Sequence, residues 1–560
     1  MFDKVRLSRC IWAFFIILGA LVGAALLWTT GCEQIGSPDE ALHWTQPWRF
    51  VQGDVPFLHE WHPSVLCGIL LVPILKVFQF LGFGDVDGFM VSARHSFAIV
   101  WVFFVVISAL KWRQINSWAT LVGILMILVY PPWGECNFSY NAIGVLAIMV
   151  STTFYASNKS GSIFAYLISG LFFAVAVLCC PHLILVYLCY SIYAFRKERM
   201  AWVMVSAGCA IIALVFLIYL FSQISFTWFL DVLPNVLTDP EHANMSILAL
   251  LRNGIGRFFF ITHDYAYGHG VLMGSWVLLL IISILDKDRL RRINFYSSAE
   301  CILALSLWFY YSVYPLVGCN PYYMVVPLLA GSVGMLILTE DSIVRQIFFK
   351  AWLPVAGYAF VLLLSSNLGL YSSSFAFEAA SIPAAIILFR FMAKKNVHAL
   401  VRLMILSLMC LHIVLSFRCI ICRVAATKRP SRVELMEGPL AGARVSPQEA
   451  HIYNTIWDDT KDMRVDNSIR TVCFLDHRNQ WLYLTTEKPS ASFSSWMCGV
   501  NTNSITRLDY YWELCPEKMA DAIFLPKKHD EFAVHFEDKY GYQREVKESG
   551  NIILHRKSDK

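Results

Sequence analysis

The stretch SPDEALHWTQPWRFVQGDVPFLHEWHP (37–63) follows directly on the first long apolar run of the chain. Ser37 suits an N-cap and Pro38 suits a first helical turn, so the pattern predicts a helix over 38–52. Trp44 and Trp48 would share one face of that helix, as in a helix lying at a membrane interface. The stretch therefore places a cluster of ionisable side chains at the mouth of a membrane segment: Asp39, Glu40, His43, Asp54, His59, Glu60 and His62.

The composition indicates a membrane protein. The chain has 560 residues, of which 57% are hydrophobic and 15% are charged, whereas soluble domains carry about 25% charged residues. A helix needs about 20 apolar residues to cross a bilayer. The sequence predicts an all-α polytopic fold with about 13 spans, over 11–30, 95–110, 117–133, 141–157, 162–180, 182–195, 201–221, 270–285, 297–316, 322–339, 351–369, 376–393 and 400–418.

Basic residues between the spans set the expected topology. Lys4, Arg6 and Arg9 place the N-terminus in the cytoplasm, and the apolar run after them is expected to be a retained anchor. The segment 63–82 is expected to lie on the outer surface, because Lys111 and Arg113 then fall inside. The net charge of +5 arises from such clusters, so no nucleic-acid partner is expected.

Two domains are expected: a transmembrane domain over 1–422, with a first outer loop at about 31–93, and a soluble extracytoplasmic domain over 423–560. The tail alternates apolar runs with helix-like stretches such as 446–459, which is typical of a small α/β domain. Its expected strands are 471–476, 481–485, 521–526 and 551–556.

The carboxylate of Asp39 has three possible roles. It can accept a proton from an attacking hydroxyl, it can help to hold a divalent cation, or it can simply cap its helix and meet water. No cofactor is required by the pattern; Mg²⁺ or Mn²⁺ remains open, with Asp39, Glu40 and Glu135 as ligands. The group His59, Glu60 and His62 lacks the HExxH spacing of zinc sites, so no metal ligands are predicted in this group.

Several of these pieces, in this order, resemble the C-type (GT-C) membrane glycosyltransferases, which include protein O-mannosyltransferases and lipid A aminoarabinose transferases. The matching pieces are Asp39-Glu40, Gly53-Asp54-Val55-Pro56, His62-Pro63 and Arg94, followed by 128–150, 169–199 and, weakly, 320–330. The resemblance covers about the first 340 residues. It implies a polyprenyl-phosphate sugar donor, an acceptor on the outer face, Asp39 as the base, and inversion at the anomeric carbon.

The resemblance also assigns roles to further residues and shows where this chain departs from the family pattern. A second acidic residue is common where this chain has Asn141, while Glu135 lies six residues earlier. A basic residue is frequent where this chain has Pro181-His182, and Pro321-Tyr322-Tyr323 replaces a familiar Arg-Tyr. The catalytic candidates are Asp39, Glu40, Glu135 and Asn141, and the candidates for the donor phosphate are Arg94, His62, His182, Arg252 and Arg257.

Aromatic and polar side chains near the outer face are candidates for holding the acceptor. Rings with polar edges suit sugars, although Tyr also collects at membrane interfaces and in cores for physical reasons. The acceptor-binding candidates are Trp44, His263, Asp264, Tyr322 and Tyr323.

The sequence therefore favours a glycosyltransferase of the cell envelope, acting in polysaccharide, glycolipid or protein modification. Its partners would be a polyprenyl-phosphate sugar, a glycan, lipid or protein acceptor, and membrane lipids. Two alternatives stay open: a transporter or flippase of a lipid-linked saccharide, and a polysaccharide polymerase or ligase. The expected location is the bacterial inner membrane, with the C-terminal domain outside.

Overall fold

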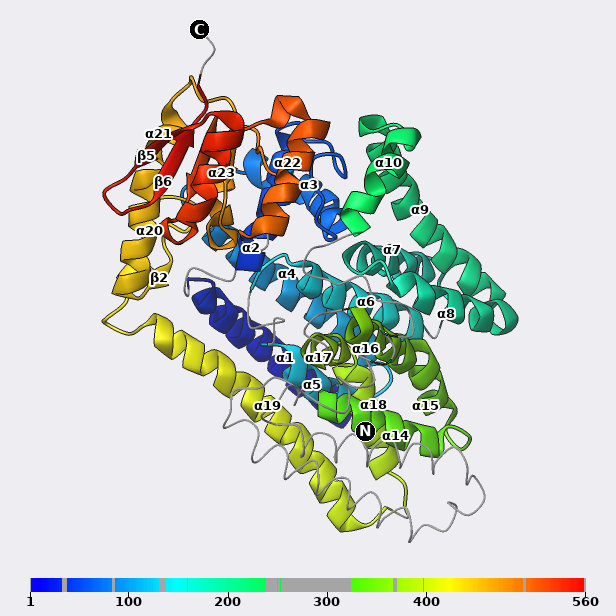
Figure 1. Ribbon diagram of the computed structural model, residues 1–560. Helices are drawn as coiled ribbons and strands as arrows, with labels where there is room; N and C mark the ends of the chain where they lie inside the picture. The colour runs from blue at the N-terminus through cyan, green and yellow to red at the C-terminus, as the bar shows by residue number, and fades with distance from the viewer. Residues whose placement is uncertain are drawn as a thin grey trace.

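The computed structural model describes residues 2–32, 38–82, 86–129, 136–158, 160–237, 249, 252, 324–365, 370–395, 397–496 and 500–557. These residues form a mostly helical bundle with a small sheet-containing domain near the C-terminus (Figure 1). The helices of the bundle are α1 (Phe2–Gly31), α2 (Pro38–Val51), α3 (Val65–Phe80), α4 (Phe89–Trp112), α5 (Ser117–Ile127), α6 (Tyr140–Ala156), α7 (Ile163–Cys179), α8 (Leu183–Lys197), α9 (Arg199–Gln223), α10 (Phe226–Leu237), α14 (Val325–Ile337), α15 (Ser342–Ile347), the π-helix η5 (Phe348–Trp352), α16 (Leu353–Ser365), α17 (Leu370–Glu378), α18 (Ser381–Met392) and α19 (Ala399–Thr427).

Within the described residues, five helical segments are long and apolar enough to cross a membrane, or six if the bent pair α17–α18 is one span. They are Cys10–Gly31, Phe89–Trp112, Arg199–Gln223, Ser342–Ser365 and Ala399–Thr427. Several other expected spans are shorter apolar helices, such as α5 with 11 residues and α6 with 17. The expected spans 270–285 and 297–316 lie outside the described residues.

Helices α1 and α4 run antiparallel, and contacts at each end fix their direction. At one end Arg94 Nη1 donates to the carbonyl of Gly31 at 3.1 Å. At the other end Trp12 Nε1 donates to the carbonyl of Ser117 at 2.9 Å, and the Arg113 guanidinium lies 5.2 Å from the Trp12 ring centroid. The basic end of α4 and the N-terminal part of α1 therefore share one end of the bundle.

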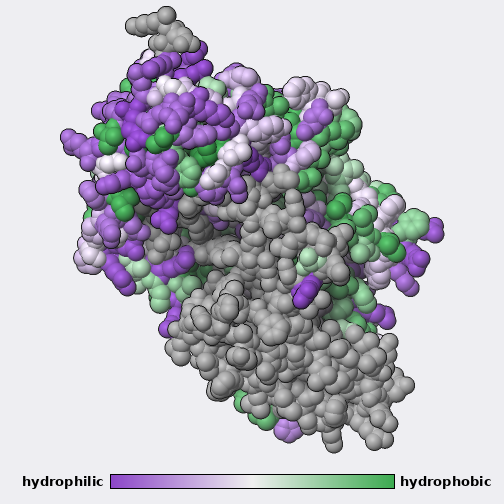
Figure 2. All heavy atoms as spheres, in the orientation of Figure 1, coloured by the Kyte–Doolittle hydropathy of each residue, from purple (hydrophilic) through white to green (hydrophobic). Residues whose placement is uncertain are grey.

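The surface of the molecule divides by polarity (Figure 2). Hydrophilic residues gather over the C-terminal domain, and hydrophobic residues gather along the side where α9 lies. Ile211, Leu214, Val215 and Ile218 on α9 are 47–62% exposed. Such a continuous apolar face is what a helix presents to lipid.

The C-terminal domain packs helices against a four-stranded sheet. Its elements are β1 (Val433–Glu434), β2 (Arg444–Val445), α20 (Pro447–Asp459), α21 (Lys461–Val465), β3 (Val472–Phe474), the 3-10 helix η6 (His477–Thr485), α22 (Thr502–Leu514), η7 (Pro516–Lys518), β4 (Ala522–Leu525), η8 (Lys527–His529), α23 (Asp530–Tyr540), β5 (Gln543–Val546) and β6 (Ile552–His555). The strand order is β3-β4-β6-β5, with β3 and β4 parallel and the other pairs antiparallel.

The expected strands at 471–476, 521–526 and 551–556 are confirmed as β3, β4 and β6. The helix expected at 446–459 is confirmed as α20, and Ser446 and Glu449 form its capping box. The strand expected at 481–485 is wrong, because this run is part of η6. Four consecutive side chains of that run are buried, so the alternation of a half-exposed strand is missing: Trp481, Leu482, Tyr483 and Leu484.

The C-terminal domain sits on the expected first outer loop. The backbone N–H of Arg444 donates to the carbonyl of Cys32 at 2.8 Å, and that of Met90 donates to Pro439 at 2.9 Å. Trp48 Nε1 donates to the carbonyl of Thr486 at 3.1 Å. The loop between α1 and α4 and the C-terminal domain are therefore on the same side of the bundle (Figure 1).

Two glycines let α7 and α9 approach closely. A Cβ at Gly170 would lie 2.0 Å from the Val205 carbonyl oxygen, and one at Gly208 would lie 2.4 Å from that of Leu167.

We expect Gly208→Val to push the two helices apart and to cost about 1–3 kcal/mol or more of stability. A thermal unfolding curve in detergent measures this. Ala213→Val, at an exposed position of α9, is the control; equal melting temperatures for the two variants would contradict the expectation.

Candidate functional site

The first turn of α2 holds two adjacent carboxylates in different surroundings. Asp39 is exposed, whereas Glu40 is only 1% exposed. Arg94 of α4 donates to Glu40 through Nε to Oε1 and through Nη2 to Oε2, both at 2.6 Å. Such a two-point ion pair is short and directional. Glu40 is therefore fixed in place, and Asp39 is the carboxylate of the two that solvent or a substrate can reach.

Arg94 was expected to bind the donor phosphate, and its geometry favours another task. It is 4% exposed, and three of its donor groups point to protein oxygens of Glu40 and Gly31. A phosphate would have to displace these partners. In this arrangement Arg94 joins α1, α2 and α4, and its role toward a phosphate stays a prediction.

The structure differs from the expectation of an interfacial α2, because this helix is buried. Trp44 is fully buried, with its ring centroid 5.1 Å from that of Phe89 and 5.6 Å from that of Phe138. Trp48 is 8% exposed and donates to the carbonyl of Thr486, the residue directly after η6. The helix is covered by the C-terminal domain and by α3, so Trp44 offers no exposed surface to an acceptor here.

Polar groups continue along one face of α2 behind Asp39. Positions 39, 43 and 46 share a face at helical spacing. His43 is 2% exposed, and within the described part of the chain neither of its ring nitrogens has a hydrogen-bond partner. Burial, with a smaller contribution from His62, lowers the pKa of His43 to about 3, so this ring is neutral at pH 7. The sequence contained this signal, since His43 follows Asp39 by four residues, but no role was assigned to it.

Residues of the next loop and of α6 lie close to His43. Its ring centroid lies 5.1 Å from that of Tyr140, the first residue of α6, which Asn141 follows. His62 Nδ1 lies 2.6 Å from Ser64 Oγ, which donates to Gln46 Oε1 at 3.2 Å. Asp39, His43 and Gln46 therefore follow one face of a single helix, and Tyr140 and His62 lie near its middle.

The remaining candidate residues are placed less closely or not described. His182 is exposed at the N-cap of α8, Arg252 is exposed, and Asn141 is half-buried. Six candidates lie outside the described residues: Glu135, Arg257, His263, Asp264, Tyr322 and Tyr323.

A second charged network joins the first loop to the C-terminal domain. Arg49, at 1% exposure, donates to Asp54 at 2.6 Å, to Glu60 at 2.8 Å and to the carbonyl of Ser492 at 2.9 Å. Lys518 of η7 also donates to Asp54. Burial by itself would raise the pKa of Asp54, but Arg49 and Lys518 outweigh it and lower the pKa. The carboxylate is therefore held ionised inside the interface.

One cluster next to this network has the composition of a metal site. The ligand atoms of His59, Cys515 and Glu517 lie within 4.8 Å of one another. However, His59 Nδ1 accepts a hydrogen bond from the Val55 backbone at 2.9 Å, so the neutral ring carries its proton on Nε2. Nε2 is the atom that lies 3.9 Å from Glu517. The ring thus presents a proton instead of a lone pair, and the cluster does not fit a bound metal.

The interface network predicts a loss of stability in acid. Burial lowers the pKa of His59 to about 4, from an ordinary value of 6.5. The unfolded chain therefore binds a proton that the folded chain excludes, and stability falls as pH drops from about 6.5 toward 4, by about 3 kcal/mol at most from His59. The stabilisation that comes from the lowered pKa of Asp54 is lost only at still lower pH. Melting temperatures between pH 8 and 4.5 check this.

The control for this prediction is His59→Asn, because an Asn oxygen can still accept from Val55 but does not titrate. Unfolding of the variant should take up about one proton fewer, so its melting temperature should change less between pH 8 and 4.5. Part of the pH dependence of stability remains in this variant, because the pKa of His43 is likewise lower in the folded chain, at about 3, than its ordinary value of 6.5. Identical slopes for the two proteins would contradict the assignment to His59.

No protein-family model matches the chain, and no curated protein sequence matches it significantly. The ordered motifs therefore remain a resemblance, and the functional argument has to be made from the residues.

Proposed function

We propose that the chain is an integral-membrane glycosyltransferase of the GT-C type, with about 13 spans. It transfers a sugar from a polyprenyl-phosphate donor to an acceptor on the outer face of the membrane. The observation that carries the proposal is the contrast within the first turn of α2. Arg94 fixes and neutralises Glu40, while the neighbouring Asp39 stays exposed. One carboxylate is thereby left as an accessible base at a rigid helix terminus.

In the proposed reaction, Asp39 accepts the proton of the acceptor hydroxyl as its oxygen attacks the anomeric carbon. The bond between that carbon and the phosphate oxygen breaks from the opposite face, so the configuration inverts. The leaving group is the polyprenyl phosphate, whose charge needs cations or hydrogen-bond donors. Among the described phosphate candidates, His62 is linked to α2 through Ser64, which lies 2.6 Å from His62 Nδ1 and donates to Gln46.

The pattern of basic residues supports the proposed topology. Trp12 lies close to Arg113, so the end of the bundle that carries Lys111 and Arg113 also holds the start of α1. Under the positive-inside rule this end faces the cytoplasm. The first loop and the C-terminal domain then face the extracytoplasmic side, in the inner membrane of a bacterium, where lipid-linked sugars and envelope acceptors would meet.

One observation favours a transporter of a lipid-linked saccharide as the second candidate. Glu378 and His412 are fully buried, and His412 Nε2 lies 3.1 Å from Glu378 Oε1. Glu378 also ends α17, where the chain bends by 63° before α18. Ionisable residues inside the membrane and broken helices both occur in transporters. The polymerase or ligase alternative centres on outer-loop arginines, and it gains no support from the described residues.

The direct test uses the purified full-length protein in nanodiscs with a panel of polyprenyl-phosphate hexoses and pentoses. Release of free polyprenyl phosphate together with a sugar-bearing acceptor, both detected by mass spectrometry, supports the proposal. An intact donor in every reaction overturns it. A donor that stays intact but crosses the bilayer of a proteoliposome supports the transporter instead.

A further inference from the structure

We propose that the groove between α8 and α16 binds an anionic phospholipid, with one hydrocarbon chain in the groove and the phosphate at its basic end. This inference concerns a site remote from Asp39, and it does not depend on the proposed function.

The groove has the size and lining of a site for a hydrocarbon chain. It encloses about 500 Å³, within the range of roughly 300–1,000 Å³ that is usual for ligand sites. Its walls are apolar side chains of α8, η5 and α16, among them Leu185, Val186 and Phe360. Small residues create the hollow, since Cys189, Pro354 and Gly357 all face it. Among the described residues of this lining, the polar groups are the Tyr190 and Tyr193 hydroxyls and the Cys189 thiol, and the rest of the wall is apolar.

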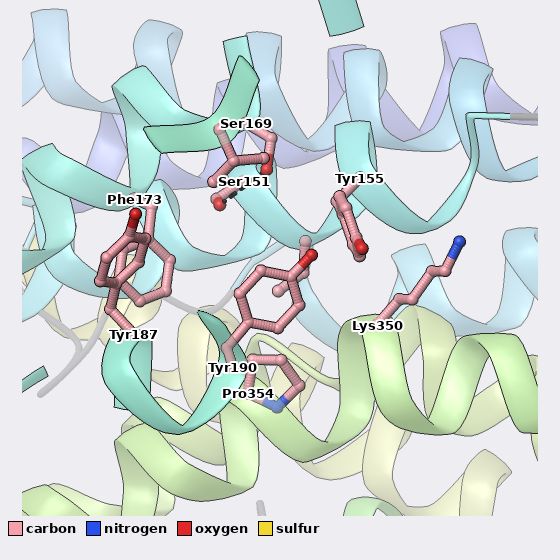
Figure 3. A pocket seen from close by; sticks show the side chains of 10 residues that line it. Ser151, Tyr155, Ser169, Phe173, Tyr187, Tyr190, Lys350 and Pro354 are labelled. Carbon is pink, nitrogen blue, oxygen red and sulfur yellow. Dashed lines mark hydrogen bonds between the residues drawn. The ribbon is translucent and has the colours of Figure 1, made fainter. Parts of the chain in front are cut away.

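The inner wall of the groove is closed. Tyr190 and Pro354 belong both to the groove and to a small pocket behind it, which Ser151, Ser169 and other side chains line (Figure 3). That pocket has only about 20 Å³ of free space, which is room for about one water molecule. The occupant must therefore lie along the outside of the bundle and cannot enter between α6, α7 and α8.

One end of the groove is basic. There the Tyr193 and Phe349 rings stack at 5.5 Å, and Arg345 acts electrostatically on the Tyr193 hydroxyl. Helix α8 ends in Arg196 and Lys197, which are exposed, as is Arg345.

The acidic residue at this end is already paired. Lys350 Nζ lies 2.6 Å from Glu198, so the charges of these two side chains cancel. The positive charges of Arg196, Lys197 and Arg345 are not offset by Glu198. Figure 3 shows Lys350 at the edge of the small pocket, on the side of Tyr155.

The charge of this end selects among lipids. Basic clusters at the membrane boundary attract anionic headgroups more strongly than zwitterionic ones. Lys350 lies over the ring of Tyr155 near the end of α6, and Lys111 lies over that of the neighbouring Phe154. The basic end of the groove is thus at the same end of the bundle as Lys111, which places the lipid in the leaflet on that side.

The test measures lipid retention by native mass spectrometry of the full-length protein. Phosphatidylglycerol and phosphatidylcholine with identical acyl chains are added at equal concentrations. We expect at least tenfold preferential retention of one phosphatidylglycerol. Arg196→Gln combined with Arg345→Gln should reduce its retention to the level of phosphatidylcholine, whereas the matched surface variant Arg113→Gln should retain it unchanged.

A second arm tests the groove itself. Cys189→Trp fills the hollow and should reduce phosphatidylglycerol retention at least tenfold, while Ile211→Trp on the exposed face of α9 should not. Equal retention of the two lipids, or undiminished retention by Cys189→Trp, overturns the proposal. So does displacement of phosphatidylglycerol by an equimolar polyprenyl phosphate, because the groove would then serve that lipid. The charge variants lie on the surface, so they decide the question even if Cys189→Trp fails to fold.

Discussion

Replacing Asp39 by Asn is expected to lower kcat for sugar transfer by about 10²- to 10⁴-fold, the usual contribution of a general base. The amide has the shape of the carboxylate but cannot accept the proton of the acceptor hydroxyl. Because Asp39 is exposed at the start of α2 and Glu40 holds the helix to Arg94, the variant should fold normally. Donor binding should also be kept, since the proposed contacts to the donor phosphate are assigned to other residues. The measurements are single-turnover transfer and the melting temperature of each protein.

Two comparisons separate chemistry from folding. Asp231→Asn removes another exposed carboxylate, on α10, and should leave transfer unchanged. Glu40→Gln should lower the melting temperature, because the buried Arg94 then lacks a charged partner, so its loss of activity would follow its loss of stability. If the Asp39→Asn protein kept more than half of the wild-type rate, Asp39 would not be the base.

Arg49→Ala is expected to destabilise the protein by about 3–5 kcal/mol, the range measured when one partner of a buried ion pair is removed. The guanidinium bonds the carboxylates of Asp54 and Glu60 and the carbonyls of His59 and Ser492. Without it, Glu60 retains only hydrogen bonds from uncharged donors such as Ser495. The contact between the first loop and the C-terminal domain should therefore weaken more than the bundle itself.

Limited proteolysis and thermal unfolding in detergent measure this effect. The C-terminal domain of the variant should be released by protease at concentrations that leave the wild type intact. Arg429→Ala, which removes an exposed arginine just after α19, is the matched control and should change neither result. Equal protease resistance of the Arg49→Ala and wild-type proteins would show that the network does not hold the interface.

Local patterns in the sequence predicted helices such as α2 and α20, whereas the lengths of several expected spans and the burial of α2 depend on contacts remote in sequence. Helix α2 was expected from Pro38 onward and begins there, because proline geometry and the acidic first turn act within a few residues. Its burial was not foreseen, because the partner of Trp48 is Thr486, which is 438 positions away. In the same way, the sequence shows Asp39 and Glu40 as equivalent neighbours. Arg94, which lies 54 positions beyond Glu40, makes them different.

Other differences have similarly physical causes. The run 481–485 has the residues of a strand, yet Asp476 caps a 3-10 helix there and Trp481 stacks on Tyr453 at 4.3 Å. The strand β5 shows the opposite case, a strand that the hydrophobic pattern does not predict. Its residues are exposed and partly charged, yet it pairs with β6. The outer-surface position expected for 63–82 stays a prediction. The structure shows that this segment forms α3, a 16-residue helix that packs on α2 and α7.

The interface between the first loop and the C-terminal domain has a consequence for biosynthesis. Asp54 and Lys518 are 464 positions apart, and a ribosome adding about 5–20 residues per second needs about 20–90 s to produce the second after the first. During that time Arg49 and its two carboxylates lack the surface of the C-terminal domain that will enclose them. The first loop is thus made early but reaches its native environment late, and a nascent chain halted before η7 cannot form this buried network.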